Sequence, residues 1–194
     1  MNYGELRSQF LSLLNRDDCS DSLADTFITL GLRRIERRLR TPLQRATYEY
    51  TVPSEWDGKF TIPSNYLGLY KVTAKGYPLS RISQAQQDQY TGFWIQGPSF
   101  YFNVPLQQGE IISLEYYYEF PLSGSDTDVT GYSLVLSDVV MYAALVFAAD
   151  HFIDSRKADY DTTFNILLEE VQQMADADDF AGGRFITPYG AGLV

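Results

Sequence analysis

The chain has 194 residues, of which 45% are hydrophobic, and this is enough for one large domain or two small domains with a buried core. Its formal charge is −10, from 25 acidic against 15 basic side chains, which makes it a poor general binder of nucleic acid because affinity for phosphates comes mainly from lysine and arginine. A single cysteine, Cys19, excludes an intrachain disulfide and a four-cysteine zinc site.

The chain opens with a short amphipathic helix, predicted from Tyr3 to Leu14, whose apolar residues recur three and four positions apart on one face. A polar turn follows, in which Ser20 or Ser22 can serve as the N-cap of the next helix. The sequence has no signal peptide and no apolar run near the roughly 20 residues that cross a bilayer, so we expect a soluble protein made in the cytosol.

The next helix, predicted from Ser22 to Thr41, combines an apolar stripe with five arginines. The stripe has helical spacing and is predicted to be buried; it consists of Ala24, Ile28, Gly31, Leu32, Ile35 and Leu39. The arginines are Arg33, Arg37 and Arg40 on the opposite side and Arg34 and Arg38 on the flanks. Balancing the helix dipole needs fewer cations than this, and guanidinium groups bind carboxylate or phosphate in a bidentate manner. We therefore predict that these arginines contact a neighbouring subunit or a partner.

Residues 46–122 change to the alternating pattern of β-strands, interrupted by turn residues such as Asp57-Gly58 and Gly97-Pro98. The predicted strands are Thr47 to Val52, Lys59 to Ile62, Leu69 to Ala74, Leu79 to Ile82, Phe93 to Gln96, Phe100 to Val104 and Ile111 to Phe120. A short surface helix is predicted from Ser83 to Tyr90. Short strands at this spacing predict a small antiparallel sandwich or barrel.

A helical pattern returns after a polar loop. Leu134 to Ile153 is almost wholly apolar and is predicted to be buried on most of its circumference, whereas Arg156 to Asp176 is amphipathic. The two predict an antiparallel hairpin. The simplest assembly is an α+β protein: a discontinuous helical bundle, with two helices from each end of the chain, and an inserted β domain. This divides the chain into residues 1–45, 46–122 and 123–180, followed by an extended tail at 181–194.

Few residues are candidates for catalysis or metal binding. His151 is the only histidine and lies in the apolar helix, which favours a packing role, and Cys19 lies among aspartates, which raise the pKa of a thiol. Residues 126–131, D-T-D-V-T-G, begin like a calcium loop but have Ser137 where the twelfth-position glutamate is expected, so a polar turn before a helix is the better interpretation. We therefore predict no enzymatic activity, no metal and no cofactor.

Aromatic residues and acidic pairs leave two alternative functions open. Tyrosine and tryptophan are frequent in the predicted strands, as at Trp94 and at Tyr116 to Tyr118, and could form cross-strand pairs, a protein contact or a sugar-binding surface. Acidic pairs such as Glu169 with Glu170 permit a carboxylate hydrolase, which would need two acids about 5 to 9.5 Å apart across a cleft. The alternatives are therefore a carbohydrate-binding module and, with less support, a carboxylate hydrolase.

The tail after residue 183 reads RFITPYGAGLV and is too short to form a core of its own. Its alternating apolar residues would suit addition as a strand to a partner. We predict partner or subunit contacts for Arg184, Phe185, Ile186 and Tyr189.

Several short motifs resemble one known family in their order and spacing. The second helix carries R-I-x-R-x-L-R at residues 34–40. The other motifs are Ile62-Pro63, Tyr66-Leu67, Val72, Gly76, Pro78-Leu79, the run LEYYYEFPLS at 114–123, and Ser137 to Tyr160. Together they resemble the adaptor proteins, or head-to-tail connectors, of short-tailed bacteriophages. Tyr132 stands near the place where that family often has a tryptophan.

The resemblance implies a ring of twelve copies beneath the portal protein of the capsid, with the tail or nozzle protein attached below. It implies a structural protein of the virion that joins the head-tail junction after DNA packaging, helps to retain the genome and lets it pass at infection. In such adaptors the helical part and the C-terminal segment contact the portal, and the β part faces the next tail component. Assembly would take place in the host cytoplasm, with no membrane and no sequence-specific binding of DNA.

A ring requires that one surface of a subunit meet a different surface of the next subunit. The polarised charge of this chain offers such a pair, because the arginine flank could meet acidic residues of a neighbour. These acids are Glu169, Glu170, Asp176 and Asp178. An acidic lumen would also repel phosphate and let DNA slide. The contact between the arginines and these acids and the acidic lumen are both hypotheses.

Overall fold

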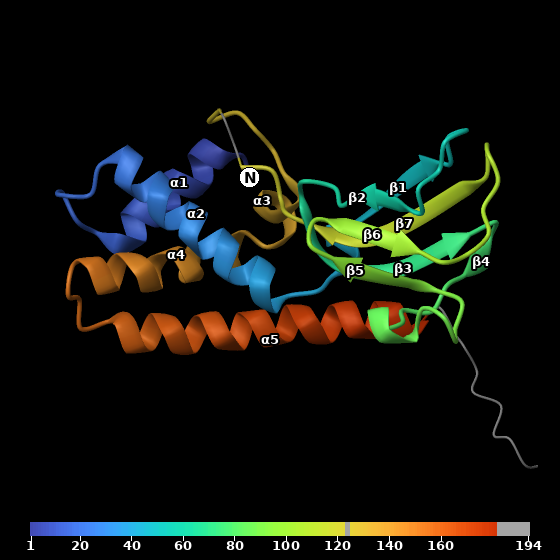
Figure 1. Cartoon of the computed structure of the whole chain (residues 1–194). Coiled ribbons are helices and arrows are strands. Elements are labelled where there is room, and N and C mark those ends of the chain that lie inside the picture. The colour runs from blue at the N-terminus through green and yellow to red at the C-terminus, as the bar shows by residue number, and fades with distance from the viewer. Residues whose placement is uncertain (123–124, 182–194) are drawn as a thin grey trace, which may run out of the picture. The chain divides into compact units, whose positions relative to one another are not determined.

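A computed structural model describes residues 1–122 and 125–181, the last four of these by their backbone alone (Figure 1). The chain divides into two compact units. The helical unit combines the described parts of Met1–Pro42 and Gly124–Val194, and the β unit comprises those of Leu43–Ser123. Helices at both ends of the chain with antiparallel sheets between them confirm the predicted α+β class.

The described part of the helical unit contains five α-helices. They are α1 (Tyr3–Leu14), α2 (Asp21–Arg38), α3 (Gly131–Val135), α4 (Ser137–His151) and α5 (Lys157–Ala181). Side chains cap the first two helices at their N-termini. Asn2 and Glu5 form a reciprocal capping box at α1, and the Ser20 hydroxyl accepts a hydrogen bond from the backbone N–H of Leu23 at α2.

Helices α2 and α4 pack at close range around a glycine. The apolar stripe of α2 is buried as predicted, and so is most of the circumference of α4. A Cβ atom placed on Gly31 would lie 2.7 Å from the backbone nitrogen of Ala144 and 3.1 Å from the Cβ of Ala143. The contact therefore depends on small residues in both helices, which come from opposite ends of the chain.

The β unit contains two antiparallel sheets. Its strands are β1 (Arg45–Thr51), β2 (Lys59–Thr61), β3 (Tyr66–Ala74), β4 (Tyr77–Pro78), β5 (Phe93–Gln96), β6 (Ser99–Phe102) and β7 (Ile111–Tyr118). The four-stranded sheet has the order β1-β7-β3-β4, and the three-stranded sheet has the order β2-β6-β5. All strand pairs of both sheets therefore lie within one continuous segment of the chain, residues 45–118.

Side chains from both sheets form one core in the β unit. Its buried members are Val52, Phe60, Val72, Ala74, Phe93, Phe100, Phe102, Ile112, Leu114 and Tyr116. Buried and outward residues alternate along β6, because successive side chains of a strand point to opposite faces. The ring centroid of Phe100 lies 5.4 Å from that of Phe60 and 6.1 Å from that of Phe93. Two sheets around a shared core form a sandwich, one of the two predicted forms.

Three predicted elements differ from the structure by more than the positions of their ends. The helix predicted from 134 to 153 is divided into α3 and α4, because Leu136 has a ψ of 20°, far from the helical value. The strand predicted from 79 to 82 is replaced by β4. Lys75 and Gly76 both have positive φ and form a two-residue turn, so pairing with β3 resumes directly at Tyr77. The helix predicted from 83 to 90 is a single 3-10 turn, η2 (Gln84–Gln86).

Candidate assembly surface

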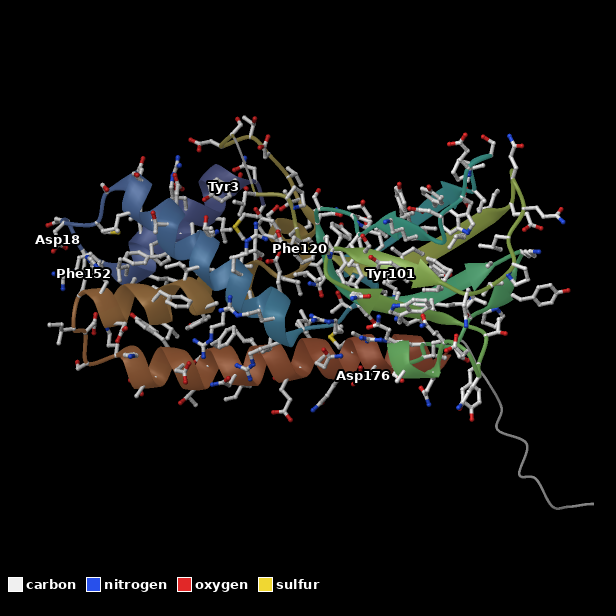
Figure 2. All side chains as sticks on the ribbon, in the orientation of Figure 1. Tyr3, Asp18, Tyr101, Phe120, Phe152 and Asp176 are labelled. Atoms are coloured by element: carbon white, nitrogen blue, oxygen red, sulfur yellow. The ribbon has the colours of Figure 1, made fainter. Side chains whose placement is uncertain are left out.

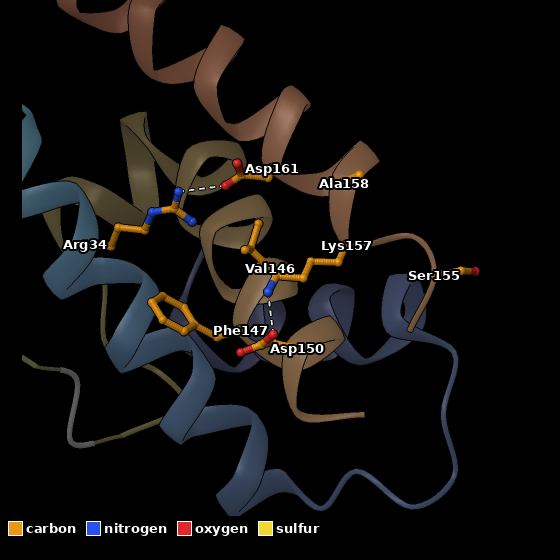
Figure 3. Close-up of a pocket in the computed structure, with 8 residues that line it drawn as sticks. All are labelled: Arg34, Val146, Phe147, Asp150, Ser155, Lys157, Ala158 and Asp161. Atoms are coloured by element: carbon orange, nitrogen blue, oxygen red, sulfur yellow. Dashed lines mark hydrogen bonds and ion pairs between the residues drawn. The ribbon is translucent and has the colours of Figure 1, made fainter. Parts of the chain in front are cut away.

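Two of the five arginines of α2 bind side chains of α5. Arg34 donates a hydrogen bond from Nη2 to Oδ1 of Asp161 at 2.7 Å (Figure 3), and its guanidinium carbon lies 4.4 Å from the ring centroid of Phe164. Arg38 donates from Nη1 to Oδ1 of Asn165 at 2.7 Å and lies 5.5 Å from the same ring. Arg34 and Arg38 are four residues apart, as are Asp161 and Asn165, so the two pairs lie on successive turns. These contacts hold α5 against α2.

Arg40 and Gln172 connect the end of α2 to α5. The Gln172 side chain accepts a hydrogen bond from the Arg40 backbone nitrogen at 3.0 Å and donates one to the Arg40 carbonyl at 3.2 Å. The Arg40 guanidinium donates to the carbonyls of Glu36 and Leu39 at 2.6 and 2.7 Å. Carbonyls at a helix C-terminus lack partners within the helix, so Arg40 caps this end. We call the residues that join the two helices the α2–α5 seam: Arg34, Arg38, Arg40, Asp161, Asn165 and Gln172.

Arg33 and Arg37 project from a different side of α2. Arg33 pairs with Glu36, whose side chain is buried, with Nη1 and Oε2 2.7 Å apart. Arg37 is exposed and makes no hydrogen bond or ion pair with any other described residue. Within the described chain, Arg37 is thus the arginine of the five whose guanidinium is open to an outside carboxylate or phosphate.

The acidic residues of α5 likewise divide into those that bind another described residue and those that do not. Asp176 accepts a hydrogen bond from Gln172 Nε2 at 2.7 Å. Glu169 and Glu170 are exposed, and neither forms an ion pair with another described residue. The side chain of Asp178 lies outside the described residues. Of the acids predicted to face a neighbour's arginines, Glu169 and Glu170 are those whose carboxylates are open.

A pocket of about 560 Å³ opens where α2, α4 and α5 meet (Figure 3). It is lined by Arg34, Val146, Phe147, Asp150, Ser155, Lys157, Ala158 and Asp161. Its two cations are engaged, because Lys157 pairs with Asp150 and Arg34 pairs with Asp161. Two carboxylates that each bind a cation do not resemble the pair of acids that flanks a glycosidic bond in a hydrolase. Each of the two ion pairs of the pocket joins two helices.

Cys19 and His151, the two residues considered for catalysis, lie in surroundings that do not favour it. Burial raises the pKa of the Cys19 thiol, and the carboxylate of Asp18 adds to the effect, which weakens the thiol as a nucleophile. His151 is exposed at the end of α4, although its ring contacts those of Phe27 and Phe152 at 5.5 and 4.8 Å, so it packs at the surface of the helical unit and not in its core. Among the described residues no group of three or more His, Cys, Asp or Glu side chains is placed to hold a metal ion.

Residues 126–131 form a polar turn before a helix, as the sequence predicted. Arg7 Nη2 donates to both carboxylate oxygens of Asp126 at 2.7 Å, which ties the turn to α1. Thr130 is the N-cap of α3 and forms a capping box with Ser133. The aspartates and threonine of this segment thus have structural partners.

The turn between α4 and α5 is held by an ion pair and contains a strained residue. Hydrogen bonds from the Arg156 side chain lower the pKa of Asp154 to about 2, and the closest N–O distance between them is 2.6 Å. Arg156 also donates to the Leu14 carbonyl at the end of α1 at 2.9 Å. Ile153, which is 93% exposed, has a φ of 54°, a region that favours glycine. The turn therefore exposes the apolar side chain of Ile153, while the contacts of Arg156 hold the neighbouring backbone in place.

The aromatic residues of the β unit form cross-strand pairs and also reach solvent. Trp94 of β5 lies directly opposite Tyr101 of β6, and their stacked rings have centroids 5.5 Å apart (Figure 2 labels Tyr101). Tyr66 stacks on Tyr116 across β3 and β7 at 5.8 Å. Tyr77 is exposed at the short strand β4. Cross-strand packing thus accounts for part of the aromatic content.

Arg184, Phe185, Ile186 and Tyr189 lie outside the described residues, and their role in partner or subunit contacts stays a prediction. Sequence reasoning did not single out the α5 members of the seam, Asp161, Asn165 and Gln172. A signal was present, because these three polar residues share one side of the helix and two of them repeat the four-residue spacing of Arg34 and Arg38.

A family model described as SU10 adaptor protein matches residues 1–187. The chain therefore belongs to the SU10 adaptor protein family, which confirms the resemblance seen in the short motifs and supports the role of a bacteriophage adaptor, a structural class rather than an enzyme class. The comparison with curated proteins gave no match.

No helix within the described ranges is both long enough and apolar enough to span a membrane.

Proposed function

We propose that this protein joins the portal of a bacteriophage capsid to the tail or nozzle protein below it. The observation that carries the proposal is the family match, which extends over residues 1–187 and so includes sequence from both units. An adaptor acts through contacts with the proteins on either side of it. Arg37 of α2 and the open acids Glu169 and Glu170 of α5 support such contacts, because these charged groups have no partner among the described residues and are available to a neighbour.

In this proposal twelve copies form a closed ring around the DNA channel. Each copy then needs two different surfaces, one for each neighbour. The interface would use the arginine-bearing end of α2, Arg33, Arg34, Arg37, Arg38 and Arg40, with Arg37 as its open guanidinium. The tail residues Arg184, Phe185, Ile186 and Tyr189 would add contacts with the portal or a neighbouring copy.

The ring would let DNA pass without sequence-specific contact. The chain carries a net charge of −10, and acidic groups facing the channel would repel phosphates. The protein would be added at the head-tail junction in the host cytoplasm after packaging. There it would help to retain the genome and would allow its ejection at infection.

Electron microscopy of the purified chain, with and without the portal protein of the same phage, tests the proposal. We expect a ring of this protein on one face of the portal ring, and co-sedimentation of the two proteins. A chain that stays unbound at low and at physiological salt would contradict the adaptor role. Glycan binding by the same sample without portal binding would favour the carbohydrate-binding alternative, for which the stacked Trp94 and Tyr101 are the candidate residues.

A further inference from the structure

Helix α2 carries a stripe that the described residues leave largely exposed. The α2 stripe consists of Thr26, Leu30, Arg33 and Arg37, spaced four, three and four residues apart and therefore on one side of the helix. Leu30 is 43% exposed, although Phe27, Ile28, Leu32 and Ile35 of this helix are buried. Arg37 lies two turns further along and is exposed, with no ion pair among the described residues. The stripe thus combines an uncovered leucine with an open cation.

Helix α5 carries a second stripe of complementary chemistry. The α5 stripe consists of Ile166, Glu170 and Met174, spaced four residues apart. Ile166 is 53% exposed and Met174 is 70% exposed. Glu170 lies between them, exposed and without an ion pair in the described part of the chain. A solvated helix face normally carries polar residues, so two uncovered apolar side chains beside an open acid are typical of a contact surface.

The spacings within the two stripes differ by about 4 Å, which an arginine side chain can span. Leu30 and Arg37 are about 10 Å apart along α2, and Glu170 is about 6 Å along α5 from Ile166 and from Met174, at 1.5 Å per residue. The long arginine side chain can make up the difference. When Arg37 meets Glu170, an apolar residue of α5 therefore comes close to Leu30.

The stripes of one copy cannot pair with each other. Helix α5 contacts its own α2 through the seam, where Arg34 binds Asp161 (Figure 3), and Phe164 of α5 is buried. Ile166 lies two residues from Phe164, and positions two apart on a helix point about 200° apart, so the α5 stripe faces away from the packed side. Any pairing of the stripes must therefore join two copies.

We propose that the α5 stripe of one copy docks on the α2 stripe of the next copy, with an ion pair between Glu170 and Arg37 and with one of the apolar residues that flank Glu170, Ile166 or Met174, covering Leu30. The inference rests on the proposed function, since a contact between two different surfaces is what a closed ring repeats. Two short stripes make a small contact that is weak by itself. A portal ring that holds neighbouring copies side by side raises their effective concentration and so favours assembly there.

Charge reversal in trans tests this pairing. The samples are Arg37→Glu alone, Glu170→Arg alone and an equimolar mixture of the two, each assembled on the portal ring of the same phage. Each variant alone brings like charges together at every contact, and we expect at least a tenfold loss of complete rings. In the mixture, alternating copies again join one acid with one base at every contact, and we expect rings to return. Electron microscopy and native mass spectrometry give ring number and composition.

The control is Asp17→Arg, which makes the same charge change as Glu170→Arg. Asp17 is an exposed aspartate of the helical unit that forms no ion pair within the described residues. This variant should assemble like the unaltered chain, and circular dichroism verifies that all variants are folded. Complete rings from either single variant, or a mixture that fails like its components, would overturn the pairing. Failure of the unaltered chain to bind the portal would instead overturn the proposed function, so the two failures are distinguishable.

Discussion

The helical unit and the β unit both have an apolar core but differ in the contacts that add to it. In the helical unit, α2 packs on α4 at Gly31 and is tied to α5 by directional hydrogen bonds of Arg34, Arg38 and Arg40, all between segments from opposite ends of the chain. The β unit is one continuous segment around a core of stacked rings. Directional polar contacts thus add to the apolar core of the helical unit by fixing α5 on α2, together with the open charges of the two helices, whereas the core of the β unit consists mainly of aromatic and aliphatic volume.

The two units can be observed separately in solution. Both tryptophans of the chain, Trp56 and Trp94, lie in the β unit, so tryptophan fluorescence follows that unit. Far-UV circular dichroism follows mainly the helices, which lie chiefly in the helical unit. Substitutions in one unit should therefore move one signal more than the other.

The largest effect is expected from Phe100→Ala in the β unit. Phe100 is fully buried, and its ring lies within 6.1 Å of the rings of Phe60, Tyr66 and Phe93. Loss of this volume leaves a cavity, so we expect the free energy of unfolding to fall by about 4 kcal/mol. Denaturant unfolding followed by tryptophan fluorescence measures it. Tyr77→Ala, at an exposed ring, should change stability by less than about 0.5 kcal/mol.

A smaller loss is expected from Gly31→Ala in the helical unit. Alanine favours the helix over glycine by about 1 kcal/mol, but its Cβ would lie 2.7 Å from the backbone nitrogen of Ala144. Backbone must move to relieve this overlap, so we expect a net loss of about 2 kcal/mol. The unfolding transition seen by circular dichroism should shift more than that seen by fluorescence. Thr26→Ala, exposed on the same helix, is the control, and a stabilising Gly31→Ala would show that α2 and α4 are not in close contact.

Sequence periodicity predicted the elements well where local pattern decides them. The bounds of α1 and of β5 are those predicted, because apolar spacing and flanking turn residues determine both. Leu136 shows the limit, since its non-helical ψ divides an apolar run in which the pattern is continuous. The position of β4 depended on the positive φ of Lys75, a conformation that lysine does not signal in a sequence.

The sequence predicted which residues of α2 belong to the candidate surface, but not which helix each of them contacts. A helical projection separates the buried stripe of α2 from its arginines, yet it does not tell which other helix the arginines meet. The projection placed Arg37 and Arg40 opposite the stripe and Arg34 and Arg38 on its flanks. It did not show that Arg34, Arg38 and Arg40 bind α5 and that Arg37 does not. The distinction required the three-dimensional position of Asp161 relative to α2.

The smallest effect concerns a residue of the helical unit that lowers its stability. Ile153 occupies the position after the last turn of α4 with a φ of 54°, and the hydrogen bonds from Ile153 N to Asp150 O and from Asp154 N to Ala149 O form the helix-ending motif in which glycine is usual. A left-handed conformation costs a residue with a Cβ about 1–2 kcal/mol, and glycine loses about 0.5–1 kcal/mol more backbone entropy on folding. Ile153→Gly should therefore raise the free energy of unfolding by about 1 kcal/mol, measured by circular dichroism.

Asn15 provides the matched control for this substitution. It ends α1 with the same φ of 54°, but asparagine tolerates the left-handed region, so Asn15→Gly should leave stability nearly unchanged. A gain at Ile153 without one at Asn15 would assign the effect to relief of backbone strain in one side chain. Equal changes at both positions would show instead that glycine acts there through the unfolded chain, and that the α4–α5 turn stores no strain.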